Sequence, residues 1–238
     1  KGMKKQKLKT IQTVLIAVIA LLIVYNQYEL STIGKKSSGI FSNVLSKTET
    51  INTEGGLAIK YTSTGNAVQD AINAIISKGT PAYGNEVGAS FDDPVNSLNR
   101  LAALDTRILT SSLTQEELQR FIDIDSRISC EYCCSAPSVI DSQGRDACGC
   151  AHAASFRGLT KFLLKTHPTE YSNDEILLEL TKWKSLYYPK NMVEKAAALI
   201  QNKMDLTAAA LNDRDLLNKL SAGDTSAIGE LPEMVGGC

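Results

Sequence analysis

Aromatic residues and an excess of either charge are scarce in this sequence. Phe, Trp and Tyr make up 6% of the 238 residues, and 25 Lys and Arg stand against 26 Asp and Glu. A nearly neutral chain lacks the basic field that non-specific nucleic-acid binding depends on, so we expect no nucleic-acid partner. Few aromatics, beside many Ala, Leu, Ile, Lys and Glu in the second half, favour helices over a β-sandwich or barrel.

The sequence also lacks the motifs that usually mark an enzyme. It contains no nucleophile elbow, no glycine-rich phosphate loop, no paired-carboxylate signature and no His-Glu-x-x-His. No Cys-x-x-Cys is followed by His, which excludes c-type haem attachment. Catalysis would therefore have to depend on a bound metal, and we expect a protein that is not an enzyme.

Soft metal ligands are concentrated in one short stretch. Five of the six cysteines and one of the two histidines fall between positions 130 and 152. Thiolates and neutral imidazole are the ligands preferred by zinc, copper(I) and iron–sulfur centres. The sequence therefore predicts a metal site at 130–152, with these candidate ligands: Cys130, Cys133, Cys134, Cys148, Cys150 and His152.

The kind of centre stays open at this point. Zinc closes a structural site with four ligands and is our first choice. The surplus of thiols would also suit copper(I) or a polynuclear thiolate cluster, and an iron–sulfur centre is a third possibility. Disulfides are the alternative to a metal, although staples across such short loops would contribute little stability, and a thiol redox centre is another.

An uncharged run near the N-terminus predicts a membrane anchor. Residues 10–28 carry no charge and are long enough to approach the roughly 30 Å hydrocarbon core. Lysines at positions 4, 5, 7 and 9 precede the run, which predicts a cytoplasmic N-terminus and a domain outside the cell membrane. A cleaved signal peptide is one alternative.

A filament subunit is the other alternative for this segment. The Lys1-Gly2 start resembles the residues that precede the cleavage point of type IV prepilins. That resemblance implies a pilin-like surface subunit that forms homo-oligomers through its N-terminal helix, with the cysteines merely stabilising the fold. The lysines at positions 4–9 argue against it, since a filament core would have to bury or neutralise them.

The predicted organisation is all-α. We expect an anchor helix over 1–30, a stalk over 31–66, and a helical domain over 67–238 that contains a small cysteine-rich β-hairpin knuckle at 130–152. Capping boxes at Thr114-x-x-Glu117 and Ser172-x-x-Glu175 predict two helix starts. Further helices are expected after Asn66, after Asp93, from about Ala151, and over 191–204 and 206–220.

Several charged and aromatic residues have plainer interpretations. The acidic side chains at 123, 125 and 131 and the lysines at 182, 184, 190 and 195 are expected on solvated faces. Trp183 and Tyr187 are expected in a core. His167, before Pro168 at a helix end, is expected to be structural.

Cys238 is the sixth cysteine and lies far from the others in sequence. Gly236 and Gly237 precede it and would allow a close backbone approach, and Leu231, Met234 and Val235 could anchor the segment on the domain. We therefore predict that Cys238 folds back to within ligand or disulfide distance of 130–152 and completes the site.

Overall fold

The computed structural model describes residues 50–53, 56–134, 136–220, 228–229 and 231–236. They belong to one compact unit, Thr48–Cys238, and are mostly helical, as the composition predicts. The predicted anchor, 1–30, lies outside these residues. Within the described ranges, no helix is long and apolar enough to cross a bilayer.

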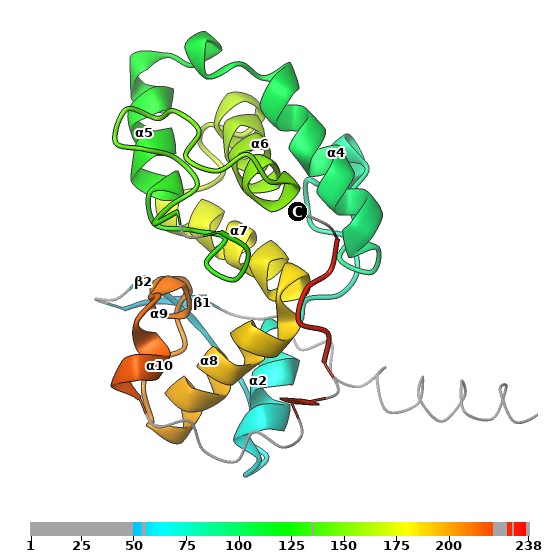
Figure 1. The fold of residues 1–238 in the computed structure, drawn as a ribbon, viewed down its shortest axis with the longest axis vertical. Helices are drawn as coiled ribbons and strands as arrows, with labels where there is room; N and C mark the ends of the chain where they lie inside the picture. The colour runs from blue at the N-terminus through cyan, green and yellow to red at the C-terminus, as the bar shows by residue number, and fades with distance from the viewer. Residues whose placement is uncertain (1–49, 54–55, 135, 221–227, 230, 237–238) are drawn as a thin grey trace, which may run out of the picture. The chain divides into compact units, whose positions relative to one another are not determined.

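The element order runs from a short hairpin into a series of helices (Figure 1). Strands β1 (Thr50–Thr53) and β2 (Gly56–Ile59) pair antiparallel, with Thr50 opposite Ile59. Leu57 and Ile59 are buried in the core. The helices are α2 Ala67–Ile75, α3 Gly84–Val87, α4 Pro94–Arg107, α5 Gln115–Asp125, α6 Ala151–Thr166, α7 Asn173–Tyr187, α8 Pro189–Gln201, α9 Ala208–Asn212 and α10 Leu216–Lys219, with a 3₁₀ turn at Thr110–Ser112.

The predicted helix starts are confirmed where a side chain caps the first turn. Thr114 and Ser172 each accept a hydrogen bond from the backbone N–H of the glutamate three residues later, and the carboxylate of that glutamate accepts one from the backbone N–H of the cap residue. Asn66 and Asp93 cap α2 and α4 through their side chains alone: Asn66 accepts from the N–H groups of Val68 and Gln69, and Asp93 accepts from the Asn96 N–H. These local bonds satisfy N–H groups that a helix leaves unpaired at its start. Because each bond joins residues only two or three positions apart, helix starts of this kind can be predicted from the sequence.

The single helical segment predicted at 206–220 is wrong. The structure has two short helices there, α9 and α10, separated at Asp213, whose backbone is extended with ψ of 115°. The Asp213 side chain accepts a bond from the Asp215 N–H, and its carbonyl accepts one from Lys195 Nζ at 2.7 Å. These bonds replace the helical pattern, so tertiary contacts interrupt a sequence that is helical by composition.

Helix α6 lies between α4 and α5, with α7 packed beside it (Figure 1). The crossing with α4 is very close at Gly158: a Cβ there would come within 2.2 Å of the Leu101 carbonyl oxygen and 2.8 Å of the Asp105 nitrogen. Glycine is thus required for backbone-to-backbone contact at this point. The α4–α6 pair forms the base on which the cysteine-rich segment rests.

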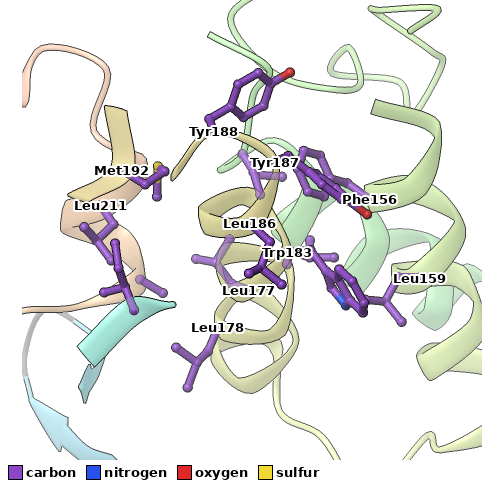
Figure 2. Packing of buried hydrophobic residues seen from close by; sticks show 14 of the residues in the cluster. Phe156, Leu159, Leu177, Leu178, Trp183, Leu186, Tyr187, Tyr188, Met192 and Leu211 are labelled. Atoms are coloured by element: carbon purple, nitrogen blue, oxygen red, sulfur yellow. The ribbon is translucent and has the colours of Figure 1, made fainter. Parts of the chain in front are cut away.

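Helix α7 is buried on two sides, as Figure 2 shows. Trp183 and Tyr187 lie toward Phe156 and Leu159 of α6, while Leu177 and Leu178 lie on the side of Leu211 and Met192. Trp183 Nε1 donates to Tyr83 Oη at 2.8 Å, which satisfies its polar atom in the core. The aromatic residues are therefore core residues, as predicted, and α7 is the central layer between α6 and the α8–α9 side.

A buried ion network joins α4, α6 and the segment before α6. Asp105 on α4 accepts from Arg157 Nη2 at 2.7 Å and pairs with Lys161 Nζ at 2.6 Å. Arg157 Nη1 donates to the carbonyl oxygens of Val139 and Cys148, at 3.1 and 2.8 Å. One buried guanidinium therefore holds both sides of the cysteine-rich hairpin against the helix pair.

Asp125 is buried, contrary to the prediction of a solvated acidic face. Its Oδ1 accepts from Thr160 Oγ1 at 2.6 Å, and its Oδ2 has no hydrogen-bond partner among the described residues. Burial raises the pKa of this carboxyl to about 7, although the Thr160 hydroxyl and Arg157 favour the ionised form. An ionised carboxylate with one unpaired oxygen is expensive to bury, so folding favours its protonated form.

We expect the variant Asp125→Asn to alter how stability depends on pH. Because the pKa is about 7 in the folded state against an ordinary 3.8, the folded protein binds more protons than the unfolded chain between these values. The free energy of unfolding of wild type should then fall as pH rises from about 4 to 7, whereas that of the variant should not. The difference between variant and wild type should therefore shift in favour of the variant by on the order of a few kcal/mol between pH 4 and pH 7. Urea unfolding across this range measures it.

The control for this experiment is Asp123→Asn, which changes an exposed carboxyl on the same helix. A difference between Asp125→Asn and wild type that stays constant from pH 4 to 8 would show that Asp125 does not titrate as its environment implies.

Candidate metal centre

The first cysteine group sits on a tight turn that follows α5. The Cys130 carbonyl oxygen accepts from the N–H groups of Cys133 and Cys134, at 2.9 and 3.0 Å. These two bonds curl residues 130–134 so that Cys130 and Cys134 stay near one another. Cys130 is buried, whereas Cys133 and Cys134 are half-buried.

The segment between the two cysteine groups turns back on itself, as the predicted hairpin requires. Ile140 and Asp146 form a single antiparallel bridge, and Ala147 N–H donates to the Val139 carbonyl at 3.2 Å. The Asp141–Gly144 turn is closed by a backbone bond of 3.0 Å, with Gly144 at φ of 75°. The observed hairpin is therefore a turn with one bridge, enough to bring Cys148 beside Cys134.

The second group enters helix α6. Cys150 is the N-cap residue, and its Sγ accepts from the Ala153 N–H at 3.4 Å. The sequence placed Cys150 and His152 at or just before a helix N-terminus, and the structure confirms this. Such a position favours a thiolate, because the helix dipole and free N–H groups stabilise negative charge.

Four free thiols form a continuous row. The Sγ atoms of Cys134 and Cys148 are 2.9 Å apart, those of Cys148 and Cys150 are 3.5 Å apart, and those of Cys150 and Cys130 are 3.6 Å apart. A tetrahedral zinc ion with Zn–S bonds of about 2.3 Å separates its sulfurs by roughly 3.8 Å, whereas a disulfide requires about 2.0 Å. Two of the three separations lie near the metal value.

A second group of donors shares Cys150. The ligand atoms of Cys133, Cys150 and His152 all lie within 4.8 Å of one another and could hold a metal ion. Cys133 is disulfide-bonded in this structure, so it can become a thiolate ligand only after reduction. The alternatives left open by the sequence, metal ligation and disulfide bonding, thus both have a place in the cluster.

His152 is fully buried and oriented by a backbone carbonyl. Its Nε2 lies 2.8 Å from the Val235 oxygen, and Tyr187 and Tyr188 each place a ring 5.0 Å from the imidazole. A carbonyl can only accept, so Nε2 carries the proton in the neutral ring and Nδ1 is left with the lone pair. This is the usual arrangement of a metal-ligating histidine, whose other nitrogen is held by an oriented acceptor.

The thiols of the row differ in pKa. Hydrogen bonding with Cys130, together with the bond from the Ala153 N–H at the helix N-terminus, lowers the pKa of Cys150 to about 3. Burial raises the pKa of Cys148 to about 12. The pKa of Cys130 is raised by the hydrogen bond between Cys130 and Cys150 and by burial. Without a metal, the cluster therefore holds its negative charge on Cys150, where the helix N-terminus stabilises it.

The C-terminal segment reaches the same site. Val235 N–H donates to the Tyr187 carbonyl at 2.8 Å, and a Cβ on Gly236 would lie 3.6 Å from His152 Nε2. Cys238 is outside the described residues, so its place in the site remains a prediction. His167, the other histidine, is the C-cap residue of α6 and contacts Glu86 and Glu170.

The lysine prediction was wrong for Lys184 and Lys195. Both are buried, and both bind Glu131 Oε1, at 2.9 and 2.7 Å. The sequence did contain a sign that Lys184 is buried: it lies four residues after Leu180 and three before Tyr187, on the apolar stripe of α7. The acidic partner, Glu131, stands between Cys130 and Tyr132, in the site itself.

Comparison of this chain with protein-family models, with curated proteins and with solved structures finds no match.

We expect mild oxidation of the metal-free protein to join Cys134 and Cys148 first. Their sulfurs are the closest of the row and both residues are half-buried, whereas Cys130 is 1% exposed. Two thiols give one disulfide, and the oxidant diamide takes up both protons and both electrons to become a hydrazine. Non-reducing peptide mapping by mass spectrometry would identify the pair.

Cys134→Ser is the control, and it should slow disulfide formation while leaving Cys148 alkylatable. A first disulfide between Cys130 and Cys150 would contradict the order that the distances give.

Proposed function

We propose that this chain is a membrane-anchored, extracytoplasmic protein that binds a soft metal ion through its cysteine cluster. The observation that carries the proposal is the row of four free thiols, Cys130, Cys134, Cys148 and Cys150, in contact across 2.9–3.6 Å. Four thiols in contact with one another are typical of a thiolate metal site. His152, and Cys133 when reduced, add donors from the adjoining group.

Zinc is the first choice for the ion. It accepts four thiolates, or three thiolates and one imidazole, and the cluster offers a row of four thiols and an adjoining group of Cys133, Cys150 and His152. Copper(I) is second, because surplus and adjacent thiolates suit it, and an iron–sulfur centre is third. A bound ion would neutralise thiolates and join the 130–134 turn, the hairpin end at Cys148 and the start of α6.

The proposed role is structural or metal-handling rather than catalytic. A metal that links three separate chain segments contributes to folding, because an equivalent site does not exist in the unfolded chain. The groups that contact His152 are the rings of Tyr187 and Tyr188 and the Val235 carbonyl. These groups orient His152 and cover it, which suits retention of an ion.

We expect protein purified under reducing conditions to contain zinc, copper or iron at one or more ions per chain, measured by inductively coupled plasma mass spectrometry. Cys150→Ser should lose most of the metal, since Cys150 belongs to both donor groups. His152→Gln should lower affinity roughly 10- to 100-fold through loss of a ligand and its oriented partner.

His167→Gln is the matched control, because it changes the other histidine outside the cluster. Wild-type protein that contains no metal, and binds none of the three when reduced and supplied with it, would overturn the proposal.

The membrane and orientation parts of the proposal have their own test. We expect an impermeant amine reagent applied to intact cells to label exposed lysines of the domain, such as Lys203, because the lysine-rich flank precedes the apolar run. Peptide mapping would locate the labels. Labelling that occurs only after lysis would contradict the extracytoplasmic placement, and recovery in the soluble fraction would contradict the anchor.

A further inference from the structure

Two lysine ammonium groups and a single carboxylate are buried beside the cysteine cluster. Lys184 Nζ and Lys195 Nζ lie 2.9 and 2.7 Å from the same oxygen, Glu131 Oε1. The side chains of the three residues are 0%, 2% and 6% exposed. Buried charges at this depth are normally balanced by partners, because removing an ion from water costs several kcal/mol.

The remaining contacts of these lysines are neutral. Lys184 Nζ donates to Asn212 Oδ1 at 3.0 Å, and Lys195 Nζ donates to the Asp213 carbonyl at 2.7 Å. Both Nζ atoms lie 5.7 Å from the centroid of the Tyr132 ring, whose face attracts cations. The Asp213 carboxylate is paired with Lys219 at 2.7 Å. Two positive charges and one negative charge thus leave the Lys184–Glu131–Lys195 group with a formal excess of +1.

This excess charge lies next to the metal ligands. Glu131 follows Cys130 in the chain, and Tyr132 precedes Cys133. Burial lowers the pKa of Lys184 to about 8, and a Cys130 thiolate, such as a bound metal would stabilise, acts in the opposite direction and favours the ammonium form. Cys130 is 1% exposed, so little water separates the two groups, and charge interactions are stronger there than at the surface.

A thiolate metal centre has the opposite excess. Four thiolates around a divalent ion sum to −2, three thiolates and one imidazole sum to −1, and copper(I) makes each total more negative by one. We propose that the buried Lys184–Glu131–Lys195 group is the counter-charge of an anionic metal–thiolate centre, and that Lys184 and Lys195 are positioning residues that raise its affinity for the metal. This inference rests on the proposed metal-binding function and deepens it.

A purely structural role predicts something different. Buried ion pairs hold elements in register whether or not a metal binds, and Lys161 is such a case: it is equally buried and pairs with Asp105. Lys161 lies nine residues after His152 on α6, or about 14 Å along the helix axis. Neutralising Lys161 should therefore reduce stability without changing metal affinity, which makes it the matched control.

The test is a zinc and cobalt(II) competition titration against a chromophoric chelator, on reduced full-length protein. Lys184→Met should weaken binding roughly 10- to 100-fold, while Lys184→Arg, which keeps the charge, should stay within about threefold of wild type. Lys161→Met should bind as wild type does. Thermal unfolding of each metal-free variant separates stability from affinity.

A second set of variants, built on a background that conserves the charge of the group, guards against a Lys184→Met variant that does not fold. Glu131→Gln with Lys184→Met removes one charge of each sign and retains +1, so it should bind nearly as wild type. Adding Lys195→Met to this pair brings the group to zero and should weaken binding as Lys184→Met does.

The outcomes are distinguishable. Wild type that binds neither ion would overturn the metal function and with it this inference. Wild type that binds, with folded Lys184→Met or the triple variant binding equally well, would overturn the counter-charge alone. Equal loss in Lys161→Met would show that the effect is one of stability.

Discussion

The arrangement of the cysteine cluster depends on one buried guanidinium. Arg157 binds Asp105 on α4 through Nη2 and the carbonyl oxygens of Val139 and Cys148 through Nη1. These bonds tie both sides of the hairpin to the α4–α6 pair, and Gly158, the next residue, allows those two helices to touch. The hairpin itself has a single bridge and could not hold its shape alone. Cys148 therefore meets Cys134 because a distant helix pair orients the chain between them.

The cluster combines three sources of favourable charge interaction. The α6 N-terminus stabilises the Cys150 thiolate, a backbone carbonyl leaves the lone pair of His152 on Nδ1, and two buried lysines share one glutamate nearby. Each acts on a different candidate ligand, and each is supplied by a different part of the chain. Cys134 and Cys148 are half-buried and therefore more accessible to oxidants than Cys130, so the thiols proposed to bind a soft metal are also the ones expected to form a disulfide first.

Sequence reasoning succeeded where the deciding interaction is local. Capping boxes at Thr114 and Ser172 and the N-cap Asn66 predicted helix starts, because a cap is a bond between residues three positions apart. It failed where the deciding partner is remote. Lys184, Lys195 and Asp125 were wrongly placed on solvated faces. The helical spacing of Lys184 did indicate burial, but no nearby residue reveals that Glu131 will pair with the two lysines or that Thr160 will bond to Asp125. The break between α9 and α10 at Asp213 was missed for the same reason, because Lys195 of α8 donates a hydrogen bond to the Asp213 carbonyl.

By itself, the sequence determined that the fold is helical, that soft ligands gather between residues 130 and 152, and that Cys150 and His152 begin a helix, because composition, spacing and capping are properties of neighbouring residues. Only the tertiary structure decided which sulfurs touch, which nitrogen of His152 is protonated, and that Gly236 lies against the imidazole. These features depend on contacts between distant segments: His152 and Val235 are more than eighty residues apart, and Cys148 is held by Arg157 of α6. Such contacts become favourable only once the core of α4, α6 and α7 has packed.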